Sequence, residues 1–378
     1  MPRPVRLLAL VTDAYGGRGG IAEFNRQMIA ALASHARVAG IDVVARVVAE
    51  ALPPLPPGVT FDGRATTGAG AFVQAALRAA RRADAVVCGH LHLVPLAAAI
   101  AAARRIPLLL VLHGIEAWQR PHGGARGLAL GLGLRRVDRY VAVSGTTRER
   151  FEAWAPVASA QGTVVPNTFD PTPFAPGAAS DETLDRYGLR GRAVVLTLGR
   201  LAGLERRKGF DVMLEALPAL AGRVPDVTYV IAGDGPDRGR LEGKAAALGV
   251  ADRVVFTGYV DEAGKPDLYR AADCFAMPSR GEGFGIVLLE AMASGVPVVA
   301  SCADGSREAV RDGLLGPAVD PGDAGAVVEA VVGALETENG VPRGLDHFSQ
   351  ARFVERWHAV VDAWLVAEAS ASGPAPSA

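Results

Sequence analysis

Short apolar runs alternate with longer segments of helical periodicity along most of this chain. In the first half they predict strands near residues 5–11, 41–48, 85–88, 107–112, 139–143 and 163–165, and helices near 21–33, 69–82, 93–104 and 146–154. Strands that alternate with helices in this way are typical of a parallel, doubly wound sheet. The first half is therefore predicted to be a Rossmann-like α/β domain.

The same alternation returns after a proline-rich segment that carries Pro166, Pro171, Pro173 and Pro176. Strands are predicted near residues 193–198, 228–232, 254–256, 274–277 and 298–300, which indicates a second sheet of the same kind. The prolines stiffen the segment between the two halves, as expected of an interdomain linker. At 378 residues the chain is also long for one domain.

The last helical pattern covers residues 349–367. It places five large apolar side chains on one face, which is predicted to be buried: Phe353, Trp357, Val360, Val361 and Trp364. The tail that follows, SASGPAPSA from Ser370, has the composition of a disordered segment.

Residues 272–300, ADCFAMPSRGEGFGIVLLEAMASGVPVVA, read as strand, glycine-rich loop, apolar helix and strand. Glu282 lies in the loop, and Glu290 is the only ionisable residue of the helix predicted at 286–294. Because an unpaired buried carboxylate costs several kcal/mol, Glu290 calls for a partner, which a bound ligand would supply. The alternative stays open that Glu290 faces solvent or caps a loop and that Glu282 is an ordinary turn acid.

Composition and charge narrow the class of protein. Half of the residues are hydrophobic and the formal net charge is -1, so no global field favours a nucleic acid partner. The first apolar run stops at Thr12 and Asp13, which predicts a strand and not a signal peptide. The apolar stretch 93–103 is shorter than the roughly 20 residues of a transmembrane helix, so we expect a soluble, cytoplasmic protein.

The cysteines and one group of arginines allow further expectations. Cys88, Cys274 and Cys302 share no metal or redox spacing and are predicted to be small buried residues in a reducing cytoplasm. The arginines at 78, 81, 82, 104 and 105 form either a solvated face or a basic face for peripheral contact with the inner membrane surface. Both interpretations stay open.

Loops that follow strands carry the candidate ligand contacts, because ligands of open α/β sheets bind at the carboxyl ends of strands. The run Gly16-Gly17-Arg18-Gly19-Gly20 precedes a helix, so it is either an anion cradle or a flexible turn. Arg200 follows a strand and Lys208, one of three lysines in the chain, precedes a helix. These two cations either clamp a pyrophosphate or are surface charges.

Histidines follow two strands of the first half. His90 and His92 lack a third ligand of matching position, so their spacing does not predict a metal site. His113 and Glu116 are expected to face the same cleft as the glycine loop. His113 is either a substrate ligand or a satisfied structural histidine.

Taken together, these motifs resemble those of the retaining family 4 glycosyltransferases of GT-B fold, over nearly the whole chain. The similar stretches are the glycine loop at 16–20, LHGIE at 112–116, YVAVS at 140–144, VVPNTFD at 164–170, GRL at 199–201, KGFD at 208–211, AGDGP at 232–236, VVFTGYV at 254–260 and PSRGEGFGIVLLEAMASGVPVVAS at 278–301. Exopolysaccharide-type members are the most similar, because ERRKG at 205–209 matches a form seen among them.

The resemblance implies two facing Rossmann-like domains, with the C-terminal helix packed back on the N-terminal domain. It divides the chain into an acceptor-side domain (1–170), a nucleotide-sugar donor domain (171–345), the returning helix (346–369) and the tail (370–378). It implies a nucleotide-sugar donor, GDP-mannose or a UDP-hexose, with no tightly bound cofactor and no metal ion.

The resemblance also assigns site residues. Glu290 should bind the ribose hydroxyls, and Glu282 with the backbone of 283–285 should contact the donor sugar and phosphates. The implied catalytic set is Arg200, Lys208, His113 and Glu282, and the implied donor-binding set is Gly19, Gly20, Phe284, Gly285, Glu290, Val255 and Gly258. Two departures stand out. Arg200 and Lys208 are spaced further apart than in most relatives, and residues 303–308, ADGSRE, stand where many relatives have two glycines before the acid that is Glu308 here.

The expected activity is transfer of a hexose, with retention, to a glycan, lipid-linked or small-molecule hydroxyl acceptor, most simply an exopolysaccharide or lipopolysaccharide intermediate. Two alternatives stay open. One is a nucleotide-sugar epimerase or phosphorylase of the same fold, and the other is a non-catalytic subunit that binds glycans or nucleotides.

Overall fold

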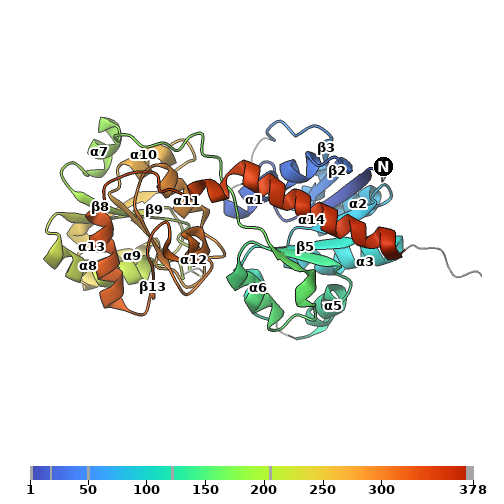
Figure 1. The fold of residues 1–378 in the computed structure, drawn as a ribbon. Coiled ribbons are helices and arrows are strands. Elements are labelled where there is room, and N and C mark those ends of the chain that lie inside the picture. Colours follow the sequence, from blue (N-terminus) through green and yellow to red (C-terminus); the bar gives the residue numbers. More distant parts are fainter. Residues whose placement is uncertain (1–2, 18, 49–51, 121–122, 204–206, 372–378) are drawn as a thin grey trace, which may run out of the picture. The chain divides into compact units, whose positions relative to one another are not determined.

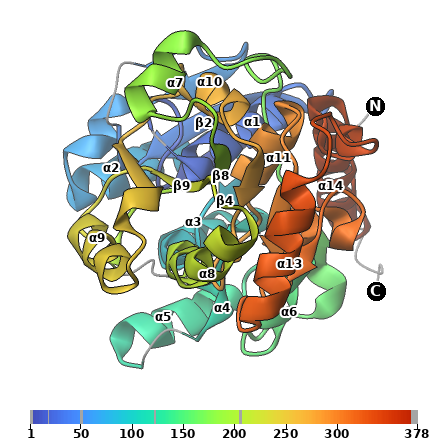
Figure 2. The same cartoon turned by 90° about the vertical axis from the view of Figure 1, so that its left-hand side faces the viewer.

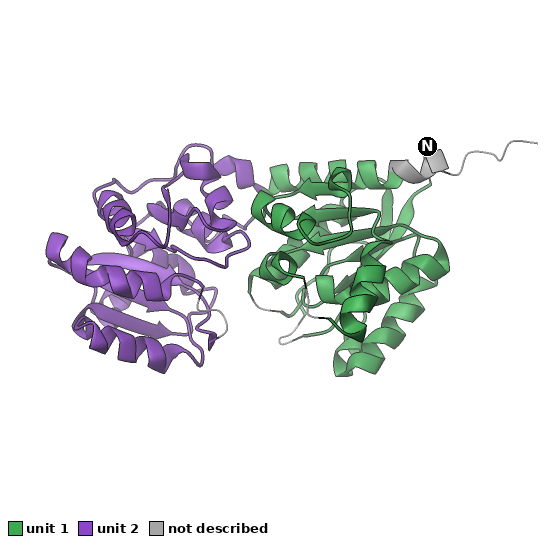
Figure 3. Ribbon diagram, turned by 90° about the horizontal axis from the view of Figure 1, so that it is seen from below, with its two compact units in different colours: residues 1–168, 350–378 green, residues 169–349 purple. Residues whose placement is uncertain are grey.

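The computed structural model describes residues 3–17, 19–48, 52–120, 123–203 and 207–371. The chain forms two compact units, each built around its own sheet (Figure 3). Unit 1 comprises residues 1–168 and 350–378, and unit 2 comprises residues 169–349. The division falls between residues 168 and 169, inside the proline-rich segment.

Unit 1 contains a seven-stranded sheet of order β3-β2-β1-β4-β5-β6-β7, in which every neighbouring pair is parallel. The central strands β4 and β5 are continuous apolar runs, AVVC and LLLVL, because helices cover both faces of a parallel sheet. The strands are β1 (Val5–Val11), β2 (Val38–Ala45), β3 (Val59–Phe61), β4 (Ala85–Cys88), β5 (Leu108–Leu112), β6 (Arg139–Ala142) and β7 (Gly162–Val164).

Helices cover both faces of this sheet (Figure 1). Right-handed crossovers place α1 on one face and α2, α3 and α5 on the other, where the three share one hydrophobic core. The helices are α1 (Gly20–Ala33), α2 (Ala69–Ala80), α3 (Val94–Arg104), α4 (Ile115–Trp118), α5 (Ala125–Leu134), α6 (Gly145–Glu152) and α14 (Gln350–Ala371).

The C-terminal helix α14 packs back on unit 1, as predicted, and its partner there is α1. Phe353 and Trp357 surround the ring of Phe24 at centroid distances of 5.8 and 6.3 Å. All five side chains of the predicted apolar face are buried, and burial of one such side chain contributes roughly 1.5–3 kcal/mol. Because α14 continues to Ala371, the first two residues of the predicted disordered tail are helical. The rest of that tail, 372–378, lies outside the described residues.

Unit 2 contains a six-stranded parallel sheet of order β10-β9-β8-β11-β12-β13. Its strands are β8 (Ala193–Leu198), β9 (Val227–Ala232), β10 (Val254–Gly258), β11 (Cys274–Ala276), β12 (Val298–Ser301) and β13 (Ala318–Val319). Its helices are α7 (Asp181–Tyr187), α8 (Phe210–Arg223), α9 (Arg238–Ala247), α10 (Lys265–Arg270), α11 (Ile286–Ala293), α12 (Ser306–Ala309) and α13 (Ala324–Leu335). Figure 2 shows α8 and α13 side by side, where they pack on the sheet.

Several elements differ from the sequence prediction. β2 was predicted at 41–48 but begins at Val38 and ends at Ala45. β3, β13, α4 and α7 are short elements that no apolar pattern indicated. α5 was missed for another reason: its sequence, ARGLALGLGL, places leucine at every second position between glycines and alanines, which hides the helical period.

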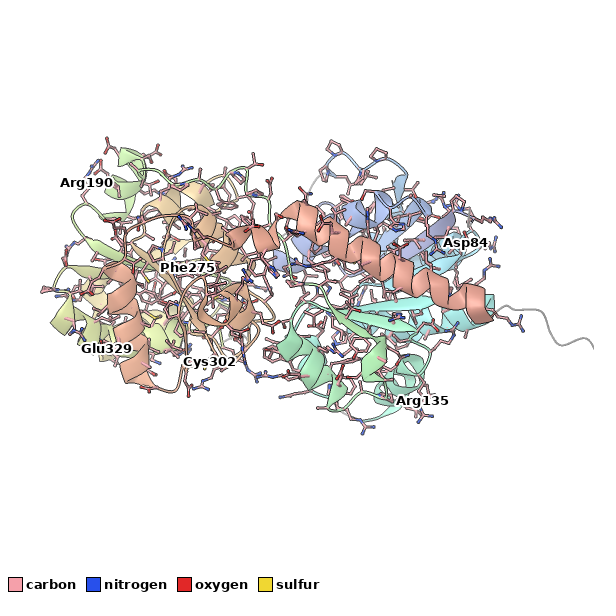
Figure 4. The ribbon with its side chains drawn as sticks, in the orientation of Figure 1. Asp84, Arg135, Arg190, Phe275, Cys302 and Glu329 are labelled. Atoms are coloured by element: carbon pink, nitrogen blue, oxygen red, sulfur yellow. The ribbon has the colours of Figure 1, made fainter. Side chains whose placement is uncertain are left out.

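One cysteine prediction is wrong. Cys88 and Cys274 are buried inside strands, but Cys302 is exposed (Figure 4). Cys302 directly follows β12, where the chain leaves the sheet. Within the described part of the chain, no helix is both long enough and apolar enough to cross a membrane.

Candidate active site

The loop between β11 and α11 is organised by the buried carboxylate of Asp304. This side chain has no exposed area and accepts hydrogen bonds from the Ser279 hydroxyl at 2.7 Å and from the Glu282 backbone amide at 2.8 Å. Ser306 donates to it from both its amide and its hydroxyl, at 3.1 and 2.7 Å. Burial raises the pKa of Asp304, and these donors oppose that shift. Residues 303–308, which depart from the family pattern, thus support the loop between β11 and α11.

Glu282 is held from a second side by Lys208. The Lys208 ammonium lies 3.1 Å from the Glu282 carboxylate, and both side chains are half-buried. The loop before α8 reaches this place because Gly209, with a φ of +88°, lies against Pro278, so a Cβ there would be 2.9 Å from the Pro278 carbonyl oxygen. The amide of Arg280 also donates to the carbonyl of Arg207. Two loops far apart in the sequence therefore form one surface.

Glu290, the acid of the apolar helix, is buried with 7% of its surface exposed, so the interpretation in which it faces solvent is wrong. The Tyr269 hydroxyl donates to its carboxylate at 2.7 Å, and the Lys265 ammonium lies 3.9 Å from the other oxygen. Burial acts to lower the pKa of Lys265, but the negative charges of Glu290 and Glu262 outweigh it and raise that pKa. The partner that Glu290 requires is therefore present within the protein, on α10.

Glycines bring the strand ends of β8, β9 and β10 together beside Arg200. A Cβ on Gly233 would be 2.0 Å from the Gly199 carbonyl oxygen, and the Gly233 amide donates to the Gly258 carbonyl at 3.0 Å. Gly199 also contacts the Lys208 stem, since a Cβ there would be 3.2 Å from Lys208 Cδ. Arg200 is exposed at this edge and directly follows Gly199, whose backbone lies against the Lys208 side chain. Between them, residues 204–206 of the unusually long spacer lie outside the described residues.

The remaining predicted residues of unit 2 occupy the same edge. Gly285 caps α11 with a φ of +96°, and the Phe284 side chain is buried against Phe348 at 5.5 Å. The whole of Phe284 is only 1% exposed, so its ring fixes the loop by packing. Val255 is half-buried in β10, and Gly258, with a φ of +74°, ends that strand. Glu308 lies in α12, in the element that begins with Ser306.

In unit 1, the predicted glycine loop leads into α1. Gly19 precedes the helix with a φ of +89°, and Gly20 is its first residue. The Arg26 guanidinium donates to the carbonyls of Ala14 and Gly17 at 2.9 and 3.0 Å, which fixes the preceding turn. Arg18 lies outside the described residues. The exposed backbone of Gly19 and Gly20 at the start of a long helix fits an anion contact.

His113 packs edge-on against Phe24 of α1 at 5.0 Å, so it lies beside the helix that the glycine loop begins. Its Nε2 lies 2.8 Å from the Gly89 carbonyl oxygen, and because a carbonyl only accepts, Nε2 carries the proton. Burial lowers the pKa of His113, which keeps the ring neutral. Glu116, expected in the cleft, instead accepts a hydrogen bond from the His113 amide at 2.5 Å. The ring atom left to accept a further hydrogen bond is Nδ1.

The two remaining histidines of the sequence prediction, His90 and His92, stabilise the turn after β4. His90 is buried, its Nδ1 accepts from the His92 amide at 3.2 Å, and the two rings are 4.8 Å apart. Among the described residues, no three His, Cys, Asp or Glu side chains are arranged to hold a metal ion.

Two supporting residues escaped the sequence prediction. The scarcity of lysine singled out Lys208, and the same signal applied to Lys265, which contacts Glu290. Asp304 carried a weaker signal, an aspartate two residues before a serine, which is typical of a side chain that binds its own turn. Its contact with Ser279, 25 residues away, had no sequence signal.

Family models match both units. A model described as Glycosyltransferase Family 4 matches residues 18–172, and one described as Glycosyl transferases group 1 matches residues 192–337. The chain belongs to the family 4 glycosyltransferases. The family that the sequence motifs suggested is confirmed.

Curated relatives of this glycosyltransferase include two mannosyltransferases. A GDP-mannose-dependent alpha-(1-6)-phosphatidylinositol monomannoside mannosyltransferase from Mycolicibacterium smegmatis is 43% identical over 211 residues, which cover 52% of this chain and 54% of that protein. A phosphatidyl-myo-inositol mannosyltransferase from Mycobacterium tuberculosis is 44% identical over 179 residues, covering 46% of this chain and 45% of that protein. The chain thus spans about half the length of the curated relatives it matches.

Solved structures of glycosyltransferases match over nearly the whole chain. Anabaena Alr3699/HepE in complex with UDP-glucose has a TM-score of 0.72 at 21% identity and covers 95% of this chain and 100% of its own. Sucrose-phosphate synthase from Thermosynechococcus elongatus has a TM-score of 0.72 at 22% identity, covering 97% and 100%. These likenesses confirm the predicted GT-B fold.

Proposed function

We propose that this protein is a retaining hexosyltransferase that moves a sugar from a nucleotide diphosphate to a hydroxyl acceptor. The observation that carries the proposal is the arrangement around α11. Glu282 lies in the loop before this helix and Glu290 lies within it, and each is already paired with a lysine, Lys208 and Lys265 respectively. One buried and one half-buried acid, each held in place by a cation beside glycine-lined strand ends, suit a ligand that offers both hydroxyls and phosphates.

The donor we propose is GDP-mannose. Of the two donors that the sequence suggested, GDP-mannose is named for a relative at 43% identity, whereas UDP-glucose is named for a structure at only 21% identity. Glu290 would accept hydrogen bonds from the ribose hydroxyls, and the backbone near Val255 and Gly258 would face the base. Unit 2 is thus the proposed donor domain.

Charge on the diphosphate would be met by Arg200 and Lys208. As the bond between sugar C1 and the phosphate oxygen breaks, negative charge grows on the leaving diphosphate, and fixed cations stabilise that charge most in the transition state. Lys208 would then bridge the diphosphate and Glu282, its present partner. Glu282 keeps a second carboxylate oxygen with which to accept a hydrogen bond from a sugar hydroxyl.

In the proposed step, the acceptor hydroxyl attacks sugar C1 from the same face from which the nucleoside diphosphate departs. The acceptor oxygen bonds to C1, the bond from C1 to the phosphate oxygen breaks, and the hydroxyl proton passes to the departing phosphate. The configuration at C1 is thereby retained, and the nucleoside diphosphate leaves. We propose that unit 1 serves the acceptor side, with Gly19 and Gly20 contacting phosphate and neutral His113 accepting a sugar hydroxyl through Nδ1. The predicted independence from metal ions is tested by assaying with a chelator.

The acceptor we propose is a lipid-linked hydroxyl. The two curated relatives are named for transfer to phosphatidylinositol species, so they support glycolipid synthesis more directly than the exopolysaccharide that the motifs suggested. An acceptor of that kind would place the protein at the inner face of the membrane, as a peripheral protein.

A transfer assay tests the proposal. The full chain is incubated with GDP-mannose and with UDP-glucose, each with and without vesicles that contain phosphatidylinositol, and nucleoside diphosphate and lipid product are measured. We expect release of GDP and formation of a mannosylated lipid. NMR of that lipid should show the same α-configuration at C1 as in the donor. Conversion of donor without acceptor would instead indicate an epimerase, and donor binding without release would indicate a non-catalytic subunit.

A further inference from the structure

A cavity of about 290 Å³ lies in unit 1 at the amino ends of the strands. Arg37, Asp84 and Ile106 line it from positions just before β2, β4 and β5. Arg3 lines it from the segment before β1, and Leu365 lines it from α14. The candidate ligand contacts of unit 1 follow the carboxyl ends of parallel strands, so they lie at the opposite edge of the sheet. The cavity is therefore separate from the proposed active site.

The turn between α1 and β2 holds Arg37 at this cavity. The Arg37 amide donates to Nδ1 of His35 at 3.1 Å, and the Arg37 carbonyl accepts a hydrogen bond from the Val5 amide at 2.7 Å. The guanidinium of Arg37 donates to the Leu365 carbonyl of α14 at 3.3 Å. Contacts at both ends of the residue therefore fix this side chain between the sheet and α14.

The two arginines of the cavity form no ion pair with a described residue. Nε of Arg37 is buried and has no acceptor within the described chain. Arg3 is exposed. By contrast, the guanidinium of Arg6 donates two hydrogen bonds to the Asp42 carboxylate, at 2.9 and 2.8 Å. A partly buried guanidinium that lacks such a carboxylate favours an anion as its partner.

Asp84 adds a hydrogen-bond acceptor to the lining (Figure 4). One of its carboxylate oxygens accepts from the Arg6 amide at 2.8 Å, which leaves the second oxygen for a hydroxyl group. Val5, Ile106 and Leu365 supply an apolar wall. The volume of about 290 Å³ is close to that of the smallest ligand pockets, about 300 Å³, so it suits a small molecule better than a single ion.

We propose that this cavity binds a small phosphate monoester that carries hydroxyl groups, such as a sugar phosphate. Arg3 and Arg37 hold the phosphate, whose oxygens match the planar fork of a guanidinium. The second oxygen of Asp84 accepts a hydrogen bond from a hydroxyl, and the carbon skeleton lies on the apolar wall. Inorganic phosphate is a poorer occupant, because it leaves both Asp84 and the apolar wall without a partner.

Isothermal titration calorimetry of the full chain tests the proposal, with glucose 6-phosphate, glucose and inorganic phosphate as probes. We expect glucose 6-phosphate to bind at least tenfold more tightly than either of the other two. Arg37→Gln should weaken its binding about tenfold or more, the loss expected when a hydrogen bond between charged groups is removed. Arg3→Gln should act in the same direction. Because Arg3 is exposed, this second variant keeps the test valid even if Arg37→Gln does not fold.

Asp84→Asn tests the hydroxyl contact. Asparagine keeps an oxygen that accepts from the Arg6 amide, but it loses the charge. Loss of that charge should change the affinities for glucose 6-phosphate and inorganic phosphate in the same direction, so their ratio isolates the hydroxyl contact. We expect the ratio to fall about fivefold, as when a charged acceptor is replaced by a neutral one. An unchanged ratio would show that Asp84 does not bind a hydroxyl group of the ligand.

Two controls separate this cavity from other phosphate sites. Arg192→Gln removes an exposed arginine directly before β8, at the amino end of a strand in the unit 2 sheet. Lys208→Ala removes the cation that we propose for the donor diphosphate. Both variants should bind glucose 6-phosphate as the unaltered chain does.

Four results would overturn the proposal. They are no binding of glucose 6-phosphate, equally tight binding of inorganic phosphate, unaltered binding by both Arg3→Gln and Arg37→Gln, and loss of binding in Lys208→Ala. The proposal stands on unit 1 alone. Binding of glucose 6-phosphate by a chain that transfers no sugar would therefore contradict the proposed function and leave this inference intact.

Discussion

Lys208 and Glu282, 74 residues apart in the sequence, form an ion pair of 3.1 Å between the loops that precede α8 and α11. The pair joins two of the stretches on which the family resemblance rests, KGFD at 208–211 and the long stretch at 278–301. Because both side chains keep some exposure, a ligand reaches them without rearrangement of the sheet. The ammonium is therefore held at the place where we propose that diphosphate charge develops.

Removal of this ammonium should slow turnover more than it weakens donor binding. For Lys208→Ala we expect kcat to fall about 100-fold or more, as when one preorganised donor to a developing anion is lost. The matched control is Lys244→Ala, because Lys244 pairs with Asp211 and Glu215 on the outer side of α8. Steady-state kinetics with the proposed donor would contradict this role if the two variants had equal kcat.

Loss of the Asp304 carboxylate should disturb the loop it supports. The Asp304 carboxylate accepts four hydrogen bonds, and in Asp304→Asn an NH2 group, which cannot accept, faces some of the same donors. This change should lower the free energy of unfolding by about 2 kcal/mol. Since Glu282 loses its backbone anchor, kcat/KM should also fall. Asp320→Asn, at an exposed turn, is the control and should leave both quantities unchanged. Urea unfolding that shows equal stability for the two variants would refute the role of Asp304.

Gly209 allows the two loops to touch, so a methyl group there should separate them. For Gly209→Ala we expect a loss of roughly 1–2 kcal/mol from the left-handed backbone alone, plus the cost of moving Pro278, and a fall in kcat/KM. Gly188→Ala has a φ of +65° but meets open space, so it should lose only the backbone contribution and keep its activity. If Gly209→Ala and Gly188→Ala have the same kcat/KM, Gly209 does not position Lys208.

Acid should weaken unit 1 through His90. Burial lowers the pKa of His90 to about 4 from its ordinary value of 6.5. The unfolded chain therefore binds the proton first, and stability present above pH 6.5 is lost as the pH falls toward 4. The loss at pH 5 should be about 2 kcal/mol. His35 and His113, whose pKa values burial also lowers, act in the same direction.

The variant His90→Asn isolates this contribution. Its side-chain oxygen replaces Nδ1 as the acceptor for the His92 amide but does not titrate in this range. Urea unfolding at pH 7 and pH 5 should show a drop smaller by about 2 kcal/mol than in the unaltered chain. An equal drop in both proteins would show that His90 does not carry the pH dependence.

Much of the fold could be predicted because both faces of a parallel sheet are covered. β1, β4 and β8 are therefore mainly apolar runs, interrupted only by Arg6 and Thr197, and the sequence marks their ends clearly. Helix α5 could not be predicted, because its outward leucines remove the polar face that defines a helical pattern.

The site was predictable in part. The cost of burying a lone carboxylate predicted that Glu290 needs a partner, and the structure supplies Tyr269 and Lys265. Which residues those are depends on how α10 packs beside α11, and spacing along the chain does not encode that. For the same reason, Asp304 was recognised as a departure from the family pattern but not as the support of Glu282.

Donor binding by Glu290 tests the central claim most directly. The dissociation constants of GDP and GDP-mannose are measured by isothermal titration calorimetry for the unaltered chain and for Glu290→Gln, which keeps an acceptor for Tyr269 but loses the charge. We predict that the unaltered chain binds both ligands and that the variant binds them about 10- to 100-fold more weakly, the loss expected when hydrogen bonds to a charged group are removed. Equal affinities, or no binding of either ligand by the unaltered chain, would contradict the account.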